Sequence, residues 1–257
     1  MHPIIPLLLV VLIAFIVFYI CVTRINYTDI PVRPGLQYTL NNKIYTVPGL
    51  SFQGTAYLLK ESFRNDQLEL LDTAVRLFRN LGIPLWLSGG TLLGFCRHNT
   101  FVPWDDDIDS HTLFMWARFL FSLVFQQECR NVGLEAVRIK WSKFKLVSRI
   151  SAGVRIRKIG TVMPCMDIFF VHRGRTHTSK IHSWTPRNIT TDIYETWEND
   201  DIFPIQRHTM CGVEVSVPNK PVAVISTQYG KNAMEHMYLT PVEMSHALPF
   251  YIESLWE

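Results

Sequence analysis

The sequence predicts one α+β domain built around a mixed sheet and preceded by a single membrane-spanning helix. Three observations support this fold class. An uncharged run opens the chain at 3–22, segments with helical spacing alternate with short apolar strands from residue 56 onward, and two predicted strands follow each other directly. The chain has 257 residues, which is enough for one sizeable hydrophobic core.

The apolar run at 3–22 is long enough to cross a bilayer as a helix. Its twenty residues rise about 30 Å, and Arg24 is the first charge after the run. No small-residue cleavage site follows, which favours an uncleaved transmembrane signal-anchor over a signal peptide. Arg24 and Arg33 place the domain in the cytosol by the positive-inside rule, whereas sequons at Asn26 and Asn188 favour a lumen. Charge alone therefore leaves the orientation open.

Residues 23–55 are rich in proline and glycine and predict a stalk or linker, so the globular domain is expected at 56–257. A second apolar stretch, 113–125, is too short for a membrane span and contains Arg118. We expect it to form a buried core helix.

The elements of the domain are expected in a definite order. Apolar residues at helical spacing predict a helix over 60–80, which Gly82 and Pro84 end. The remaining expectations, in chain order, are a strand at 84–87, a turn at 88–90, a short helix at 91–97, a strand at 102–110, a helix at 113–129, strands at 144–150, 154–159 and 166–172, and a helix at 222–229.

Net charge and cysteine spacing exclude two classes of function. A net charge of +3 lacks the strong basic field of a nucleic-acid-binding protein. The five cysteines form no Cys-x-x-Cys pair, which argues against a zinc site. Their spacing leaves two states open, namely buried small hydrophobic side chains and one or two disulfides.

An acidic cluster gives the first chemical signal. Asp105, Asp107 and Asp109 are two residues apart, so an extended chain would point all three carboxylates to one face. Carboxylates crowded in this way repel one another unless a cation neutralises them, and oxygen-only ligands suit Mg²⁺ or Mn²⁺. The alternative is a solvated acidic turn. The apolar neighbours Trp104 and Ile108 argue against that alternative.

A glycine turn gives the second signal. Ser88, Gly89 and Gly90 lie between a predicted strand and a predicted helix, where backbone amides can approach an anion such as phosphate. An ordinary strand-to-helix turn has the same composition. The interval from Gly90 to Asp107 has room for a short helix and a return strand, so the turn and the carboxylates can converge on one phosphate group.

A later carboxylate and a few basic residues complete the candidate site. Asp167 lies inside the apolar strand 166–172, where a charge needs a partner. It is expected to serve either as a metal ligand or as a general base, and a plain salt bridge is the alternative. Arg97 could pair with phosphate, and Arg155 with Arg157 could line an anionic pocket, although exposed helix ends and half-exposed strands often carry such residues.

The segment GGTLLGFCRHNTFVPWDDDID resembles the signature of the LicD and fukutin-related family. The later MDIFFV segment resembles the Asp-Ile-Phe strand of that family, and residues 218–238 are similar to its C-terminal end. The resemblance covers roughly residues 66–240. It implies a polymerase-β-like nucleotidyltransferase fold with the mixed sheet flanked by helices.

The resemblance also implies an activity. Family members transfer a phospho-alcohol, such as phosphocholine or ribitol phosphate, from a CDP-activated donor to a glycan hydroxyl of a glycoprotein or glycolipid, and they release CMP. A CDP-alcohol donor, a glycan acceptor and Mg²⁺ or Mn²⁺ are therefore the expected partners, with no nucleic acid. Animal members are type II proteins of Golgi membranes, so the resemblance implies a single-pass protein of the Golgi or endoplasmic reticulum.

Roles follow from motif position. Asp107, Asp109 and Asp167 are the expected catalytic carboxylates, and Asp105 joins Asp107 and Asp109 in the expected metal site. The expected substrate-binding residues are Gly89, Gly90, Thr91, Arg97 and Trp104. Two other functions stay open, a nucleotide-sugar glycosyltransferase with an Asp-x-Asp metal site and a non-catalytic, membrane-bound accessory protein of glycosylation.

Overall fold

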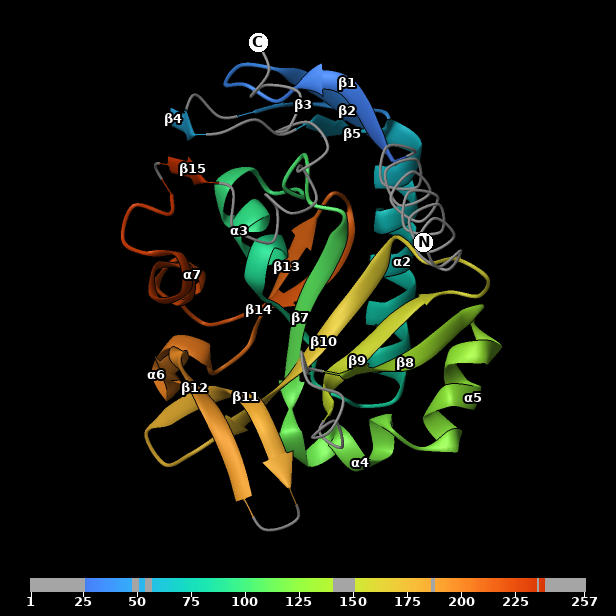
Figure 1. The fold of residues 1–257 in the computed structure, drawn as a ribbon, viewed down its shortest axis with the longest axis vertical. Coiled ribbons are helices and arrows are strands. Elements are labelled where there is room, and N and C mark those ends of the chain that lie inside the picture. The colour runs from blue at the N-terminus through green and yellow to red at the C-terminus, as the bar shows by residue number, and fades with distance from the viewer. Residues whose placement is uncertain are drawn as a thin grey trace, which may run out of the picture.

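The computed structural model describes residues 26–47, 51–53, 57–140, 151–185, 188–234 and 236–238 (Figure 1). The helices are α2 (Glu61–Asn80), α3 (Gly89–His98), the 3-10 turn η1 (Phe114–Trp116), α4 (Ala117–Leu120), α5 (Leu123–Asn131), α6 (Asn199–Ile202) and α7 (Pro221–Tyr229). The strands are β1 (Tyr27–Pro31), β2 (Gln37–Leu40), β3 (Lys43–Thr46), β4 (Ser51–Gln53), β5 (Tyr57–Leu59), β6 (Trp86–Leu87), β7 (Asp107–Leu113), β8 (Leu134–Lys140), β9 (Ser151–Lys158), β10 (Cys165–Arg173), β11 (His177–Thr185), β12 (Asn188–Glu198), β13 (Gln206–Met210), β14 (Val213–Val217) and β15 (His236–Tyr238).

A seven-stranded mixed sheet forms the centre of the domain. One path through it runs β12-β11-β10-β7-β6, and β9 joins β10 to β8. β7 and β10 are parallel, whereas β6 pairs antiparallel with β7, and both β9 and β11 pair antiparallel with β10. The predicted α+β class with a mixed sheet is therefore present.

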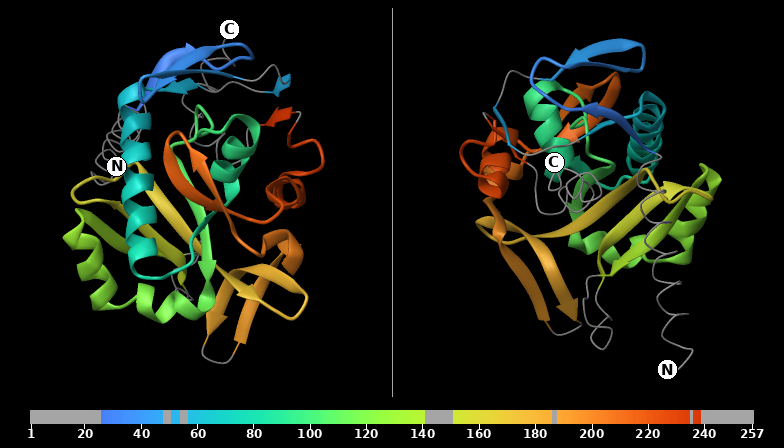
Figure 2. Two further views of the ribbon diagram at one scale, coloured as in Figure 1. Left: turned by 180° about the vertical axis from the view of Figure 1, so that it is seen from behind. Right: turned by 45° about the horizontal axis from the view of Figure 1, so that its top comes forward.

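Helix α2 covers one face of this sheet (Figure 2). Its buried side chains include Leu70, Ala74, Leu77 and Phe78, at the three- and four-residue intervals that place side chains on one side of a helix. They share a core with the even-numbered residues of the central strands, among them Ile108, Met166, Ile168, Val154 and Ile156. Because side chains alternate along a strand, the odd-numbered residues of the same strands face away from α2.

Part of the segment expected to form a stalk is folded onto the domain. The hairpin of β2 and β3 and the pair of β1 and β5 lie beside one end of α2 (Figure 1). Val32, Tyr38 and Val47 are buried there in a second small core, together with Trp104 of the acidic segment. Proline and glycine in this region therefore accompany short, packed strands.

Several expected elements differ in extent from the observed ones. The helix expected at 91–97 already begins at Gly89, so two of the three residues expected to form a turn open α3. The strand expected at 102–110 begins at Asp107, and a turn precedes it. The helix expected at 113–129 is divided, because β7 continues to Leu113 and the Ser122 side chain accepts a hydrogen bond from the Phe125 amide at the start of α5. The strand expected at 144–150 lies outside the described residues.

The expected membrane-spanning helix and the single-pass location in a Golgi or endoplasmic reticulum membrane are corrected here. Across the described ranges, no helix is both long enough and apolar enough to cross a bilayer. The physical reason is clearest in α2, which is 20 residues long but carries charged residues on the side that faces away from the core. The run at 3–22 lies outside the described residues.

Candidate active site

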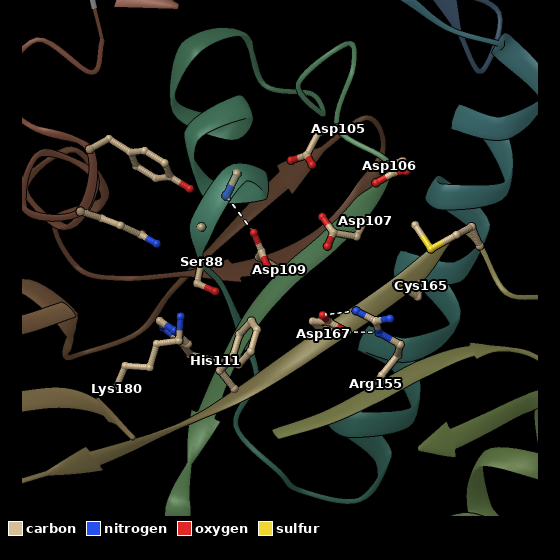
Figure 3. A pocket seen from close by; sticks show the side chains of 16 residues that line it. Ser88, Asp105, Asp106, Asp107, Asp109, His111, Arg155, Cys165, Asp167 and Lys180 are labelled. Atoms are coloured by element: carbon tan, nitrogen blue, oxygen red, sulfur yellow. Dashed lines mark hydrogen bonds and ion pairs between the residues drawn. The ribbon is translucent and has the colours of Figure 1, made fainter. Parts of the chain in front are cut away.

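A cavity of about 570 Å³ lies over the odd-numbered face of β7 and β10 (Figure 3). Residues from α3, the turn before β7, and strands β7, β9, β10 and β11 line it, and the end of α7 closes one side. The lining residues are Ser88, Gly89, Gly90, Asp105, Asp106, Asp107, Asp109, His111, Arg155, Met163, Cys165, Asp167, Phe169, Lys180, Gln228 and Tyr229.

The pleat of the two parallel strands brings carboxylates from separate segments together. Asp107 and Asp109 alternate with the fully buried Ile108, so both face the cavity. In the parallel register Asp109 lies opposite Asp167, and opposite residues of paired strands share a face. The expected convergence of the first acidic segment with Asp167 is therefore observed.

The acidic turn supplies the densest group of oxygens. Asp105, Asp106 and Asp107 each place one carboxylate oxygen within 4.8 Å of the others. Asp105 and Asp106 precede β7. Asp105 therefore reaches the cavity from the segment before the strand, and the prediction that it shares a strand face with Asp107 and Asp109 is wrong. The group contains only carboxylate oxygens, which are the ligands preferred by Mg²⁺ and Mn²⁺.

The two glycines are required because carboxylates lie directly against the turn. A Cβ atom on Gly89 would lie 2.2 Å from Asp109 Oδ2, and one on Gly90 would lie 2.3 Å from Asp105 Oδ2. The Gly90 amide donates a hydrogen bond to Asp109 Oδ2 at 3.0 Å. The turn therefore holds Asp109 through the same amide that the sequence predicts as a phosphate contact.

Asp167 has a strong partner on the neighbouring strand. Arg155 lies opposite it in the β9–β10 register and donates Nε to Oδ1 at 2.6 Å and Nη2 to Oδ2 at 2.7 Å. The Asp167 side chain is only 7% exposed, against 40% for Arg155. A two-pronged contact of this kind fixes the plane and the orientation of the carboxylate.

Crowding raises the proton affinity of the other carboxylates. Burial, followed by the charges of Asp106 and Asp167, raises the pKa of Asp107 to about 6. Burial and the neighbouring Asp107 hold the pKa of Asp109 well above its usual value. Carboxylates kept so close that they resist ionisation gain the most from a bound cation.

Groups outside the cavity hold the acidic turn in place. The fully buried Gln67 of α2 donates Nε2 to the Asp105 carbonyl oxygen at 2.9 Å. The Tyr27 hydroxyl donates to the Trp104 carbonyl oxygen at 3.1 Å. Burial and the charges of Asp106 and Asp105 raise the pKa of Tyr27 above its usual value, so this hydroxyl stays protonated and able to donate.

The wall opposite the acidic turn has a different character (Figure 3). Lys180 Nζ lies 2.6 Å from Glu195 Oε2 and 4.3 Å from the centre of the Phe169 ring. His111 lies at the cavity floor between the rings of Trp86 and Trp197. Burial and the charge of Lys180 hold the pKa of His111 well below its usual value, so its ring is neutral.

Three predicted substrate-binding residues do not line the cavity. The Thr91 hydroxyl accepts a hydrogen bond from the Asp109 amide at 2.9 Å and so supports the strand. Arg97 donates Nε to the Ala233 carbonyl oxygen at 2.9 Å, because it lies near the end of α3 far from the glycine turn. Trp104 is 4% exposed in the second core. The other predicted residues, Gly89, Gly90, Asp105, Asp107, Asp109 and Asp167, all line the cavity.

Several residues that line the cavity were not among those predicted from the sequence. His111 continues the odd-numbered alternation of Asp107 and Asp109, so the strand pattern could have identified it. Lys180 and Gln228 had no such signal, because their place depends on the register of β11 and on the packing of α7.

A family model for the LicD/FKTN/FKRP nucleotidyltransferase domain matches residues 82–220 of the chain. The matched range includes the glycine turn, the acidic segment, Arg155, Asp167 and Lys180. It covers more than half of the chain.

Curated relatives agree with this match. The chain is 27% identical over 175 residues to human "Ribitol-5-phosphate transferase FKTN", which covers 66% of the chain and 33% of that protein. It is 50% identical over 42 residues to "Lipopolysaccharide cholinephosphotransferase LicD" of Haemophilus influenzae, 16% of each chain. The matches thus span a third or less of these two relatives.

Solved structures with similarity to the chain include two antibiotic-modifying enzymes. The lincosamide antibiotic adenylyltransferase LnuA, bound to lincomycin, aligns with a TM-score of 0.40 at 12% identity, over 71% of this chain and 95% of that one. ANT(2")-Ia in complex with adenylyl-2"-tobramycin aligns with a TM-score of 0.39 at 9% identity, over 74% of this chain and 99% of that one.

Proposed function

The chain belongs to the LicD/FKTN/FKRP nucleotidyltransferase family, and on that premise we propose that it transfers a phospho-alcohol from a CDP-activated donor to a hydroxyl group of a glycan. The names of two relatives support a phospho-alcohol as the transferred group, because one is a ribitol-5-phosphate transferase and the other a cholinephosphotransferase. The acceptor hydroxyl oxygen forms a bond to the phosphorus that carries the alcohol. The bond from that phosphorus to CMP breaks, and the hydroxyl proton passes to a carboxylate of the cavity.

The carboxylates of the cavity fit a divalent cation. Asp105, Asp106 and Asp107 offer oxygens within 4.8 Å of one another, and Asp109 and Asp167 add two more carboxylates at the same cavity. A diphosphate would be repelled from five carboxylates without added positive charge. When bound, Mg²⁺ or Mn²⁺ would offset the charge of the phosphates and of the transition state.

The protein groups have distinct roles in this proposal. Asp105, Asp107 and Asp109, together with Asp167 on the neighbouring strand, would hold the cation. The Gly90 amide fixes Asp109. Asp167 supplies an oriented carboxylate, because Arg155 donates a hydrogen bond to each of its oxygens. Arg155 is thus a positioning residue for Asp167.

One observation carries the proposal more than any other. Asp109 and Asp167 come from segments far apart in the sequence, yet they lie opposite each other on neighbouring parallel strands and face one cavity. Buried carboxylates placed side by side are costly for a protein that has no cation to receive. At the same cavity the Gly90 amide donates to Asp109 and so fixes one of these carboxylates.

The test is a donor screen with the purified full-length protein and Mn²⁺, scored for CMP release. We expect release from at least one CDP-linked alcohol in the presence of a glycan acceptor, and none from UDP-sugars. Asp107→Asn and Asp109→Asn should reduce that rate at least about a hundredfold while the protein stays folded. Full activity in either variant would reject the assigned site.

A further inference from the structure

The imidazole of His111 is a polar group of the cavity that the proposed function leaves without a role. Only 2% of the residue is exposed, and it lies at the cavity floor (Figure 3). Its ring packs edge-on against Trp86, with 6.3 Å between the ring centroids, and at a tilt against Trp197 at 5.6 Å. Contacts on two sides therefore restrict the ring to a narrow range of orientations.

The two nitrogens of His111 are open to a ligand. Neither has a hydrogen-bond partner among the described residues, and neither is completely covered by protein atoms. The small accessible part of the ring thus includes its polar atoms. An imidazole carries at least one N–H donor whether it is neutral or charged. A polar group kept almost buried and without a partner is costly, which points to a ligand that pairs with it.

Most other donors at the cavity are already engaged. Arg155 and Lys180 are each paired with a carboxylate. The Gly90 amide at the start of α3 donates to Asp109. The Ser88 hydroxyl lines the cavity and makes no capping hydrogen bond to α3, so it is open as well. A phosphate oxygen at the floor would therefore meet uncharged side-chain donors.

The position of His111 places it beside the expected phosphate. It follows Asp109 on the same face of β7, and in the β7–β10 register it lies one residue pair beyond the pair of Asp109 and Asp167. A cation held by these carboxylates would contact the donor diphosphate. Two residues of a strand advance about 7 Å, which has room for a phosphate that binds the cation on one side and accepts a hydrogen bond on the other.

We propose that His111 is a further catalytic residue, which donates a hydrogen bond to an oxygen of the phosphoryl group being transferred. The inference rests on the proposed function, because it assumes that the carboxylates and a cation hold the diphosphate. In the transition state the transferred phosphoryl group spreads its charge over its equatorial oxygens. A donor that is already fixed beside one of these oxygens lowers the barrier without having to reorganise.

His111→Phe tests this role, because it removes both nitrogens and keeps an aromatic ring between Trp86 and Trp197. The assay uses the full-length protein, Mn²⁺ and CDP-ribitol or CDP-choline, whichever gives CMP release in the donor screen. We expect kcat to fall at least about tenfold and the KM for the donor to change less than about threefold. The melting temperature in EDTA should not fall, since unpartnered polar atoms give way to apolar ones.

Two conservative variants test the donor itself. The amide nitrogen of His111→Gln can take the place of Nε2, and that of His111→Asn the place of Nδ1, so one of them should recover part of the lost kcat. The matched control is His208→Phe. His208 is exposed on β13, packs edge-on against Phe95 and does not line the cavity, so its kcat should stay within about twofold.

Calorimetric titration of Mn²⁺ separates this role from metal binding. The affinity should stay within about twofold in His111→Phe. It should also do so in Lys158→Met, a control in which Lys158 pairs with Asp66 and Glu69 away from the cavity.

Each of four results would overturn the inference. Full kcat in His111→Phe would show that the nitrogens do not act on the reaction. A raised KM at unchanged kcat would limit them to ground-state binding. A lower melting temperature with a rate loss that neither amide variant reverses would assign His111 to packing, and a tenfold loss of Mn²⁺ affinity would assign it to the cation site. Absence of CMP release by the unaltered protein from every CDP-linked alcohol would instead reject the proposed function, and this inference with it.

Discussion

Arg155 and Arg157 form similar ion pairs, but only one of the two pairs belongs to the candidate site. Both lie on the same face of β9, and both pair across strands with a carboxylate, Arg155 with Asp167 and Arg157 with Glu135. Only the first pair lines the cavity. The contrast separates the effect of a cross-strand ion pair on folding from its effect on the site.

Arg155→Gln should lower the rate of CMP release at least about tenfold, because Asp167 loses both of its hydrogen bonds and its fixed orientation. Unfolding free energy should fall by about 1–3 kcal/mol, since a buried carboxylate is left without its partner. Arg155→Lys should recover part of the rate. The control Arg157→Gln should change kcat by less than about twofold, and a similar rate loss in both variants would refute a positioning role for Arg155.

Gly89 makes a second test at the scale of one residue. Its φ of +51° disfavours a side chain, and a Cβ atom would also meet Asp109 Oδ2. Gly133 has a φ of +78° but open space around it, so Gly133→Ala measures the backbone strain alone. We expect Gly133→Ala to cost about 1 kcal/mol and Gly89→Ala to cost more and abolish CMP release. Equal melting temperatures and retained activity in Gly89→Ala would contradict the observed contact.

At the scale of elements, the N-terminal strands are coupled to the acidic turn. β1 places the Tyr27 hydroxyl on the Trp104 carbonyl oxygen, beside Asp106. Trp104 in turn is buried among residues of β2 and β5. The strands thus support the segment before β7 that carries Asp105 and Asp106, two of the cavity's carboxylates.

Tyr27→Phe should weaken Mn²⁺ binding by about threefold to tenfold and cost about 1 kcal/mol of stability, because the Trp104 carbonyl loses its donor. Tyr45→Phe is the matched control. Tyr45 belongs to β3 and its hydroxyl contacts Cys211, away from the cavity. Titration of Mn²⁺ into both variants checks this, and the coupling is refuted by an unchanged affinity in Tyr27→Phe.

Sequence patterns predicted best those elements in which one continuous segment buries the side chains of one face. Spacing in the 60–80 segment matches α2, and the apolar strand around Asp167 matches β10. The predicted start of β7 was wrong by several residues. The turn before the strand is held by contacts with Tyr27 and Gln67, which are remote in sequence. The hairpin of β11 and β12 has no simple alternation that could predict Lys180, because its register shifts at bulges.

The candidate site was predictable to the extent that it lies in one motif. Gly89, Gly90 and the acidic residues have fixed spacing and side-chain types that only a few chemistries need. Arg97 and Trp104 lie in the same motif but serve the packing of α3 and of the second core. Charge type and proximity in sequence do not tell which side of a helix or turn a residue faces.

For the whole molecule, the crowded carboxylates make stability depend on pH. Asp107 has a pKa of about 6 in the folded protein, against an ordinary value of 3.8. The folded state therefore binds more protons than the unfolded state between these values, so the contribution of Asp107 to stability is present below about pH 4 and is lost as pH rises through about 6. Asp109 acts in the same direction.

In EDTA, Asp107→Asn should be more stable than the unaltered protein at pH 7, and the difference should shrink as pH falls to about 4. With saturating Mn²⁺ at pH 7, the unaltered protein should be more stable than Asp107→Asn. The cation stabilises the folded protein that retains the Asp107 carboxylate as a ligand. Thermal melting at each pH, with and without Mn²⁺, checks both statements. A difference that stays constant from pH 4 to pH 7 would refute the raised pKa.

The central claim is that carboxylates from two distant segments share one divalent cation. Calorimetric titration of Mn²⁺ at pH 7 into the unaltered protein, Asp109→Asn, Asp167→Asn and the control Lys158→Met tests it most directly. We predict saturable binding by the unaltered protein and the control, and at least a tenfold weaker affinity in each Asp variant. No binding by the unaltered protein, or undiminished binding by Asp167→Asn, would contradict the claim.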